Sequence, residues 1–89
     1  MTRPTATIRI NTSYATVRIG RQYARNLARA LESEFPDWDV DIIPGAVDAV
    51  AVPIEDTVEN FRTEFRVREL MTASLMKAVD DCKHDRDRQ

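Results

Sequence analysis

The sequence contains few of the residues that build redox, metal and phosphate sites. Its 89 residues include one cysteine, Cys82, and one histidine, His84, too few for an internal disulfide or a structural zinc site. With two glycines, Gly20 and Gly45, it lacks the glycine-rich loop that binds nucleotide phosphates. No apolar run approaches the roughly 18 residues of a membrane span. These absences predict a soluble protein that binds no cofactor and no metal.

The amino-terminal segment MTRPTATIRI has no continuous apolar stretch and no small-residue cleavage site, so it does not resemble a secretory signal. We therefore expect a cytoplasmic protein without a membrane anchor. A chain of 89 residues buries only about 60 to 65% of its unfolded surface, which makes its core marginal. We expect one domain over residues 1–83, a polar tail over 84–89 that frays, and support from a protein partner or a second copy.

The charges are segregated along the chain. Residues 1–31 contain six arginines and no acid, and residues 32–61 contain nine acids and no base. Residues 62–89 are nearly balanced, which leaves a formal net charge of -2. Such a division either attracts a partner or lets the two parts neutralise each other.

One five-residue pattern occurs twice near the amino terminus, as ATIRI at 6–10 and as ATVRI at 15–19. In both copies apolar residues alternate with arginine, which is typical of a half-buried strand, and Asn11, Thr12 and Ser13 favour a turn between them. This pattern predicts a hairpin. The alternative is a helix that begins after Ser13 as its N-cap, because Val17, Gly20 and Ala24 also fall on one helical face.

Residues 21–35 have a helical pattern under either interpretation, and Pro36 ends it. Arginines recur along one flank of this helix at every fourth position, so they could contact nucleic-acid phosphates. The alternative is a solvated flank that is partly paired with Glu32 and the acidic segment. The candidate nucleic-acid-binding residues are Arg18, Arg21, Arg25 and Arg29.

Two strands are expected next. In WDVDII, residues 38–43, apolar and acidic residues alternate, and Pro44 and Gly45 suggest a turn into an antiparallel return strand over 46–54. Trp38 is expected in the core or in an interface, and less often as an exposed stacking surface. The acids Asp37, Asp39, Asp41 and Asp48 could gather on one face, although their spacing matches no calcium loop.

No glycine or proline interrupts the chain from Glu55 to its polar end, which predicts a long helix over about 57–83. The segment FRTEFRV also alternates, so a strand over 61–67 is the minority alternative. The apolar positions of the helix shift sideways near Arg66 to Arg68, which indicates two covered faces. One face would contact the sheet, and the other would contact a partner.

These elements predict an α+β fold in which a single antiparallel sheet of three to four strands carries two helices on one face, in the order ββαββα or βαββα. No set of residues offers a nucleophile, a base and an orienting group together, so we expect no enzymatic activity.

The order of elements resembles the small dimerisation subunit of the KEOPS complex, which places threonylcarbamoyl on tRNA adenosine. In that family a strand, a helix closing on a Pro-Asp pair, a hairpin and a long helix opening on an apolar-Arg pair follow one another. Pro36-Asp37 and Phe61-Arg62 lie at the matching places, and Leu75-Met76 lies where the last helix of the family packs. Residues 1–14 depart from the family pattern as an extra strand or arm.

The resemblance implies a non-catalytic scaffold that dimerises, docks on a catalytic ATPase-fold subunit through its last helix, and contacts tRNA through its arginines. The expected partner-binding residues are Phe61, Arg62, Phe65, Leu70, Met71, Leu75 and Met76. Two other hypotheses stay open from the residues alone. One is a phage-type inhibitor whose acidic face imitates nucleic acid for a host nuclease, and the other is a nucleic-acid-binding protein.

Overall fold

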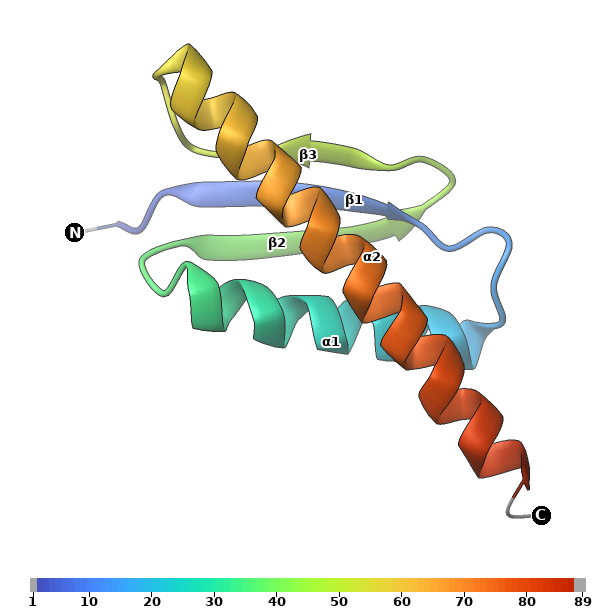
Figure 1. Ribbon diagram of the computed structural model, residues 1–89. Coiled ribbons are helices and arrows are strands. Elements are labelled where there is room, and N and C mark those ends of the chain that lie inside the picture. The colour runs from blue at the N-terminus through green and yellow to red at the C-terminus, as the bar shows by residue number, and fades with distance from the viewer. Residues whose placement is uncertain (1, 88–89) are drawn as a thin grey trace.

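The computed structural model describes the backbone of residues 2–87 and the side chains up to Lys83. Five elements follow one another in the order βαββα (Figure 1). Strand β1 covers Thr5–Asn11, helix α1 Val17–Glu34, strand β2 Asp39–Gly45, strand β3 Ala49–Ala51 and helix α2 Thr57–Asp87. The expected α+β class is therefore confirmed, with the shorter of the two element orders.

Strand β1 lies at the centre of a three-stranded mixed sheet in the order β2-β1-β3. Ile8 pairs with Ile42 of the parallel strand β2 and with Val50 of the antiparallel strand β3. The prediction of an antiparallel sheet is wrong because α1 forms a crossover connection between β1 and β2, and such a connection returns the chain in the same direction. Strands β2 and β3 form no hairpin, since β1 separates them.

The second copy of the opening pattern is helical, so the predicted hairpin is wrong. Thr16 is the N-cap of α1, and its Oγ1 accepts a hydrogen bond of 3.2 Å from the backbone N–H of Ile19. Ser13 has a different role, because its hydroxyl donates to Asn11 Oδ1 at 2.6 Å in the connecting loop. Gly20 is buried, and a Cβ atom there would lie 3.4 Å from Thr12 Cβ. This is ordinary van der Waals contact, so the loop leaves room for an alanine at this position.

The connection from α1 to β2 is compact. Phe35 and Trp38 stack with ring centroids 4.0 Å apart and an interplanar angle of 7°. The Trp38 N–H donates to the Phe35 carbonyl at 3.1 Å, which closes a turn around Pro36. Both rings are half-buried against the core, so Trp38 has the expected structural position.

Strand β2 includes Pro44 and Gly45, which the sequence pattern placed in a turn. A proline lacks the N–H that a central strand needs, but β2 is an edge strand with one neighbour. The return strand is shorter than the predicted 46–54, because only Ala49–Ala51 pair with β1.

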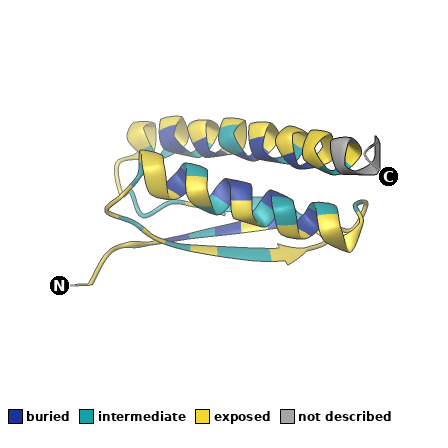
Figure 2. Cartoon of the chain, turned by 90° about the horizontal axis from the view of Figure 1, so that it is seen from below, coloured by how far each residue is buried: buried dark blue, intermediate teal, exposed yellow. Residues whose placement is uncertain are grey.

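One face of the sheet is covered and the other is open. On β1 the side chains of Ala6, Ile8 and Ile10 are fully buried, while Thr5 and Arg9 on the opposite face are exposed. Both helices lie on the same side of the sheet (Figures 1 and 2). The core consists of buried residues from β1 and both helices: Ala6, Ile8, Ile10, Tyr23, Leu27, Leu31, Val67, Met71 and Ala78.

Helix α2 crosses the sheet from β3 toward α1 and projects beyond the amino-terminal end of α1 (Figure 1). Asp56 Oδ1 accepts a 2.9 Å hydrogen bond from the Glu59 N–H at its start. Against α1, the Asn26 side chain donates to the Ser74 carbonyl at 3.2 Å and accepts from Gln22 at 2.9 Å. The helix continues to Asp87, beyond the expected end at residue 83, and residues 61–67 are helical. No helix within the described residues is long and apolar enough to cross a membrane.

Candidate functional site

Helix α2 carries a row of exposed apolar side chains, which we call the α2 stripe. Because successive residues turn by about 100° around a helix, its members point within roughly 60° of one another. Phe61 is 71% exposed, Phe65 61% and Met76 67%. The members are Val58, Phe61, Phe65, Met76 and Val79. Arg68 and Thr72 occupy the same face between Phe65 and Met76, so the middle of the stripe is polar.

The structure brings some of the expected partner-binding residues to this surface and places others elsewhere. Phe61, Arg62, Phe65 and Met76 are exposed. Leu70 and Leu75 are half-buried against the core, and Met71 is 5% exposed within it. Met71 follows Val67 by four residues, on the face of α2 that points inward. Met71 therefore stabilises the fold and does not present its side chain to a partner.

A hollow of about 330 Å³ lies beside the polar middle of the α2 stripe. It is formed by the loop before α1, the middle of α1, the loop between β2 and β3, and α2. We call it the tyrosine pocket. Its lining residues are Tyr14, Tyr23, Asp48, Arg68, Met71, Thr72, Leu75 and Met76. No local pattern in the sequence indicated this pocket, because its walls come from four separate segments.

Tyr23 and Asp48 are two of the polar residues that line the pocket. Tyr23 is 3% exposed, and burial raises the pKa of its hydroxyl to about 12, with smaller contributions from Asp48 and Tyr14. Asp48 Oδ1 accepts a 2.7 Å hydrogen bond from the backbone N–H of Asn11. Tyr23 is therefore neutral at physiological pH, and Asp48 supplies a negative charge.

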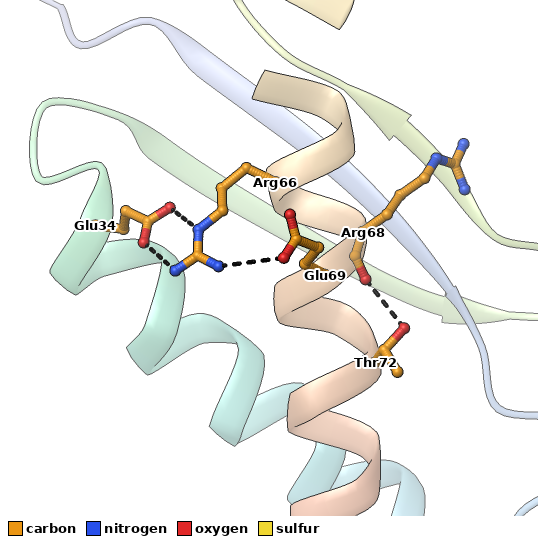
Figure 3. A network of polar contacts seen from close by, with 5 residues as sticks. All are labelled: Glu34, Arg66, Arg68, Glu69 and Thr72. Carbon is orange, nitrogen blue, oxygen red and sulfur yellow. Dashed lines mark hydrogen bonds and ion pairs between the residues drawn. The ribbon is translucent and has the colours of Figure 1, made fainter. Parts of the chain in front are cut away.

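Arg68 lies at the rim of the pocket but is already paired. Its Nε and Nη2 donate to Glu64 Oε1 at 3.2 and 3.0 Å. Figure 3 shows its side chain directed away from the neighbouring Glu34–Arg66–Glu69 network. Arg68 and Asp48 therefore place charges of opposite sign at the pocket.

The predicted arginines occupy the exposed flank of α1. Arg21 and Arg25 have no ion-pair or hydrogen-bond partner within residues 2–83, so the expected pairing with Glu32 does not form. Helix α2 adds two cations that the sequence pattern did not indicate. Lys77 and Arg29 line one hollow, and Lys83 and Arg18 line another. We call these six residues the basic band: Arg18, Arg21, Arg25, Arg29, Lys77 and Lys83.

Three of the four acids considered for an acidic face lie on two sides of the molecule. Asp39 and Asp41 pair in register with Thr5 and Thr7, on the open face of the sheet. Asp48 lines the tyrosine pocket on the helical side. Among the described residues no group of three acidic, histidine or cysteine side chains is arranged to hold a metal ion. Cys82 is half-buried, and the side chain of His84 lies outside the described residues.

In comparisons with known proteins, no family model matches this chain. No curated protein matches it either.

Proposed function

We propose that this protein is a non-catalytic interaction subunit that docks on another protein through the α2 stripe. The observation that supports the proposal is the alignment of Phe61, Phe65 and Met76, each more than half exposed, along one helical face. Exposed large apolar side chains that cluster on one face are typical of interaction sites. An amphipathic helix commonly binds by laying such a face into an apolar groove of its partner.

The proposed partner is the catalytic ATPase-fold subunit of a tRNA threonylcarbamoyladenosine complex. Support for this partner comes from the Pro36-Asp37 and Phe61-Arg62 pairs and from the long last helix, which resemble the small subunit of that complex, although β2 and β3 do not form the hairpin of that family. In this role the chain positions an enzyme and has no reaction of its own. A homodimer is part of the same proposal, because a small marginal core gains stability from a second copy.

Co-purification with the ATPase-fold subunit from the same genome tests this function. Phe61→Gln combined with Phe65→Gln removes two exposed rings without touching the core. We expect binding to weaken by roughly 30-fold or more, as for central interface residues. Val17→Gln is the control, because Val17 is 72% exposed and belongs to α1. Equal retention of the parent and the double variant would contradict the proposal, and sedimentation of the chain alone measures dimerisation.

The basic band supports a second candidate function, contact with nucleic acid such as tRNA. Arginines and lysines on adjoining helices can neutralise phosphates, and each such contact makes affinity fall with salt. In a plot of the logarithm of the tRNA-binding constant against the logarithm of the salt concentration, Arg21→Gln with Arg25→Gln should make the slope shallower by about one unit per residue. Arg3→Gln with Arg9→Gln removes the same charge elsewhere and is the control. If both pairs change the slope equally, only net charge matters and the basic band is no binding surface.

A further inference from the structure

The cations of the basic band form two rows, one on each helix. The α1 row follows the exposed flank of that helix from Arg18 to Arg29, over a length of roughly 17 Å. The α2 row consists of Lys77 and Lys83. Each lysine lines a hollow together with an arginine of α1, Lys77 with Arg29 and Lys83 with Arg18. The two rows therefore lie side by side.

The distance between the two rows is set by the packing of the helices (Figures 1 and 2). The Asn26 side chain of α1 donates to the Ser74 carbonyl of α2 at 3.2 Å, and both residues line the hollow between Arg29 and Lys77. The axes of packed helices lie about 8 to 10 Å apart. The grooves of a nucleic-acid duplex, roughly 6 to 12 Å wide in B-form DNA, separate two rows of phosphates by a similar distance. A single strand has only one row of phosphates.

Among residues 2–83, the charged residues that line the four hollows along the basic band are all basic. They are Arg18, Arg21, Arg25, Arg29, Lys77 and Lys83. Glu32 and Asp80, which are close to the band in the sequence, line none of these four hollows. The tyrosine pocket differs, because Asp48 and Arg68 give it both signs of charge. The lining of the basic band therefore favours a polyanion.

The aromatic rings of the protein lie on other surfaces. Phe61 and Phe65 belong to the α2 stripe, and Tyr14 lines the tyrosine pocket. Phe35 and Trp38 are half-buried and stack on each other after the end of α1. Proteins that bind single strands commonly stack the unpaired bases on aromatic side chains beside the cations. Within the described part of the chain, the basic band offers partners to phosphates but no stacking surface to bases.

We propose that the basic band binds the backbone of double-helical nucleic acid, with one row of cations on each side of a groove. The α1 row contacts phosphates of one strand, and Lys77 and Lys83 contact phosphates of the other. Binding does not depend on base sequence, because phosphate contacts carry no sequence information. This inference rests on the second candidate function, contact with nucleic acid, and specifies the form of that nucleic acid.

Titration of the full chain with three nucleic acids at several salt concentrations tests this assignment. A short RNA duplex, a DNA duplex of the same length and one unpaired strand of the RNA duplex are followed by fluorescence anisotropy. We expect both duplexes to bind at least about tenfold more tightly than the single strand. In a plot of the logarithm of the binding constant against the logarithm of the salt concentration, six contacts predict a slope of about -5 for the DNA duplex. The four contacts of the α1 row alone predict a slope of about -3 for the single strand. A preference between the two duplexes identifies the natural target.

Removal of the α2 row separates the two forms of nucleic acid. Lys77→Gln with Lys83→Gln changes two exposed side chains and leaves the core intact. We expect the slope for the DNA duplex to become shallower, about -4, while the slope for the single strand stays the same. Arg3→Gln with Arg9→Gln removes the same charge elsewhere and should change neither slope. Equal changes for the duplex and the single strand in the lysine variant would overturn the assignment of two rows.

The outcomes separate this inference from the functions proposed above. If the single strand binds as tightly as the duplexes, the assignment to a duplex is wrong and contact with nucleic acid stands. If none of the three nucleic acids binds with a salt-dependent affinity, both are wrong. If poly-glutamate displaces the labelled duplex as effectively as unlabelled duplex does, the basic band binds acidic polymers in general and the assignment is again wrong. Docking through the α2 stripe is measured by co-purification and depends on none of these results.

Discussion

Arg66 of α2 donates from two guanidinium nitrogens to the two carboxylate oxygens of Glu34, the last residue of α1. The Nε–Oε2 and Nη2–Oε1 distances are both 2.6 Å, and Nη1 lies 3.8 Å from Glu69 Oε2 (Figure 3). This two-point contact joins residues 32 positions apart and holds the carboxyl end of α1 against α2. Planar bidentate pairs fix orientation as well as distance, so the pair helps to set how α2 crosses α1.

Glu34→Gln should destabilise the protein at neutral pH and lose that effect in acid. The hydrogen bonds from Arg66, followed by its charge, hold the pKa of Glu34 below its ordinary value. Because the pKa of Glu34 is lower in the folded protein than in the unfolded chain, its ionised form stabilises the fold at pH values above the unfolded-state pKa, which is near 4.3. This contribution disappears as the pH falls through the folded-state pKa. Urea unfolding at pH 7 and pH 3 measures the difference. Glu32→Gln is the control, because Glu32 is an exposed acid without a partner among residues 2–83. An equal loss of unfolding free energy in both variants would mean that the Glu34–Arg66 contact does not stabilise the fold.

Tyr23→Phe should have little effect at neutral pH and should protect the protein in strong alkali. The folded-state pKa of Tyr23 is about 12, against an ordinary value of 10.0. Below pH 10 the neutral Tyr23 phenol makes its full contribution to the free energy of unfolding. This contribution is lost as the pH rises through 12, because Tyr23 ionises at a lower pH in the unfolded chain than in the folded protein. The parent should therefore lose on the order of 1 kcal/mol relative to the variant at pH 11. Parallel unfolding curves for the two proteins from pH 8 to 11 would contradict this expectation.

Met71→Ala and Met76→Ala form a matched pair that tests the two faces of α2. Met71 is 5% exposed and lies in the core, so its truncation should cost about 2 to 5 kcal/mol of unfolding free energy. Met76 is 67% exposed, and its truncation should change stability by no more than about 0.5 kcal/mol. Denaturant unfolding measures both variants. Similar losses at the two positions would mean that α2 is rotated from the orientation described.

Val17→Pro tests where the first helix begins. Val17 is the first residue of α1, where a proline loses no intrahelical hydrogen bond, and Thr16 already has the extended backbone that precedes proline, with φ -66° and ψ 159°. We expect a change in stability within about 0.5 kcal/mol. Ile10→Pro, in the central strand, should be severely destabilising. A severe loss at Val17 as well would favour the strand interpretation of residues 15–19.

Local patterns identified most elements but not all of their boundaries. The helical repeat through Leu27 and Leu31, ended by Pro36, predicted the body of α1, and the unbroken run after Glu55 predicted α2. The segment Val17–Ile19 was assigned to a strand because three residues fit the two-residue period of a strand as well as the period of a helix. In the structure, the capping hydrogen bond of Thr16 starts a helix there instead.

The sequence by itself determined the α+β class and the alternating faces of β1, because both depend on the spacing of apolar residues within one segment. Only the tertiary structure decided that β1 is central, that Lys77 and Lys83 extend the arginine flank, and that Asp48 shares a pocket with Tyr23. Strand order and helix crossing follow from hydrogen bonding and packing between distant segments, which no local pattern encodes.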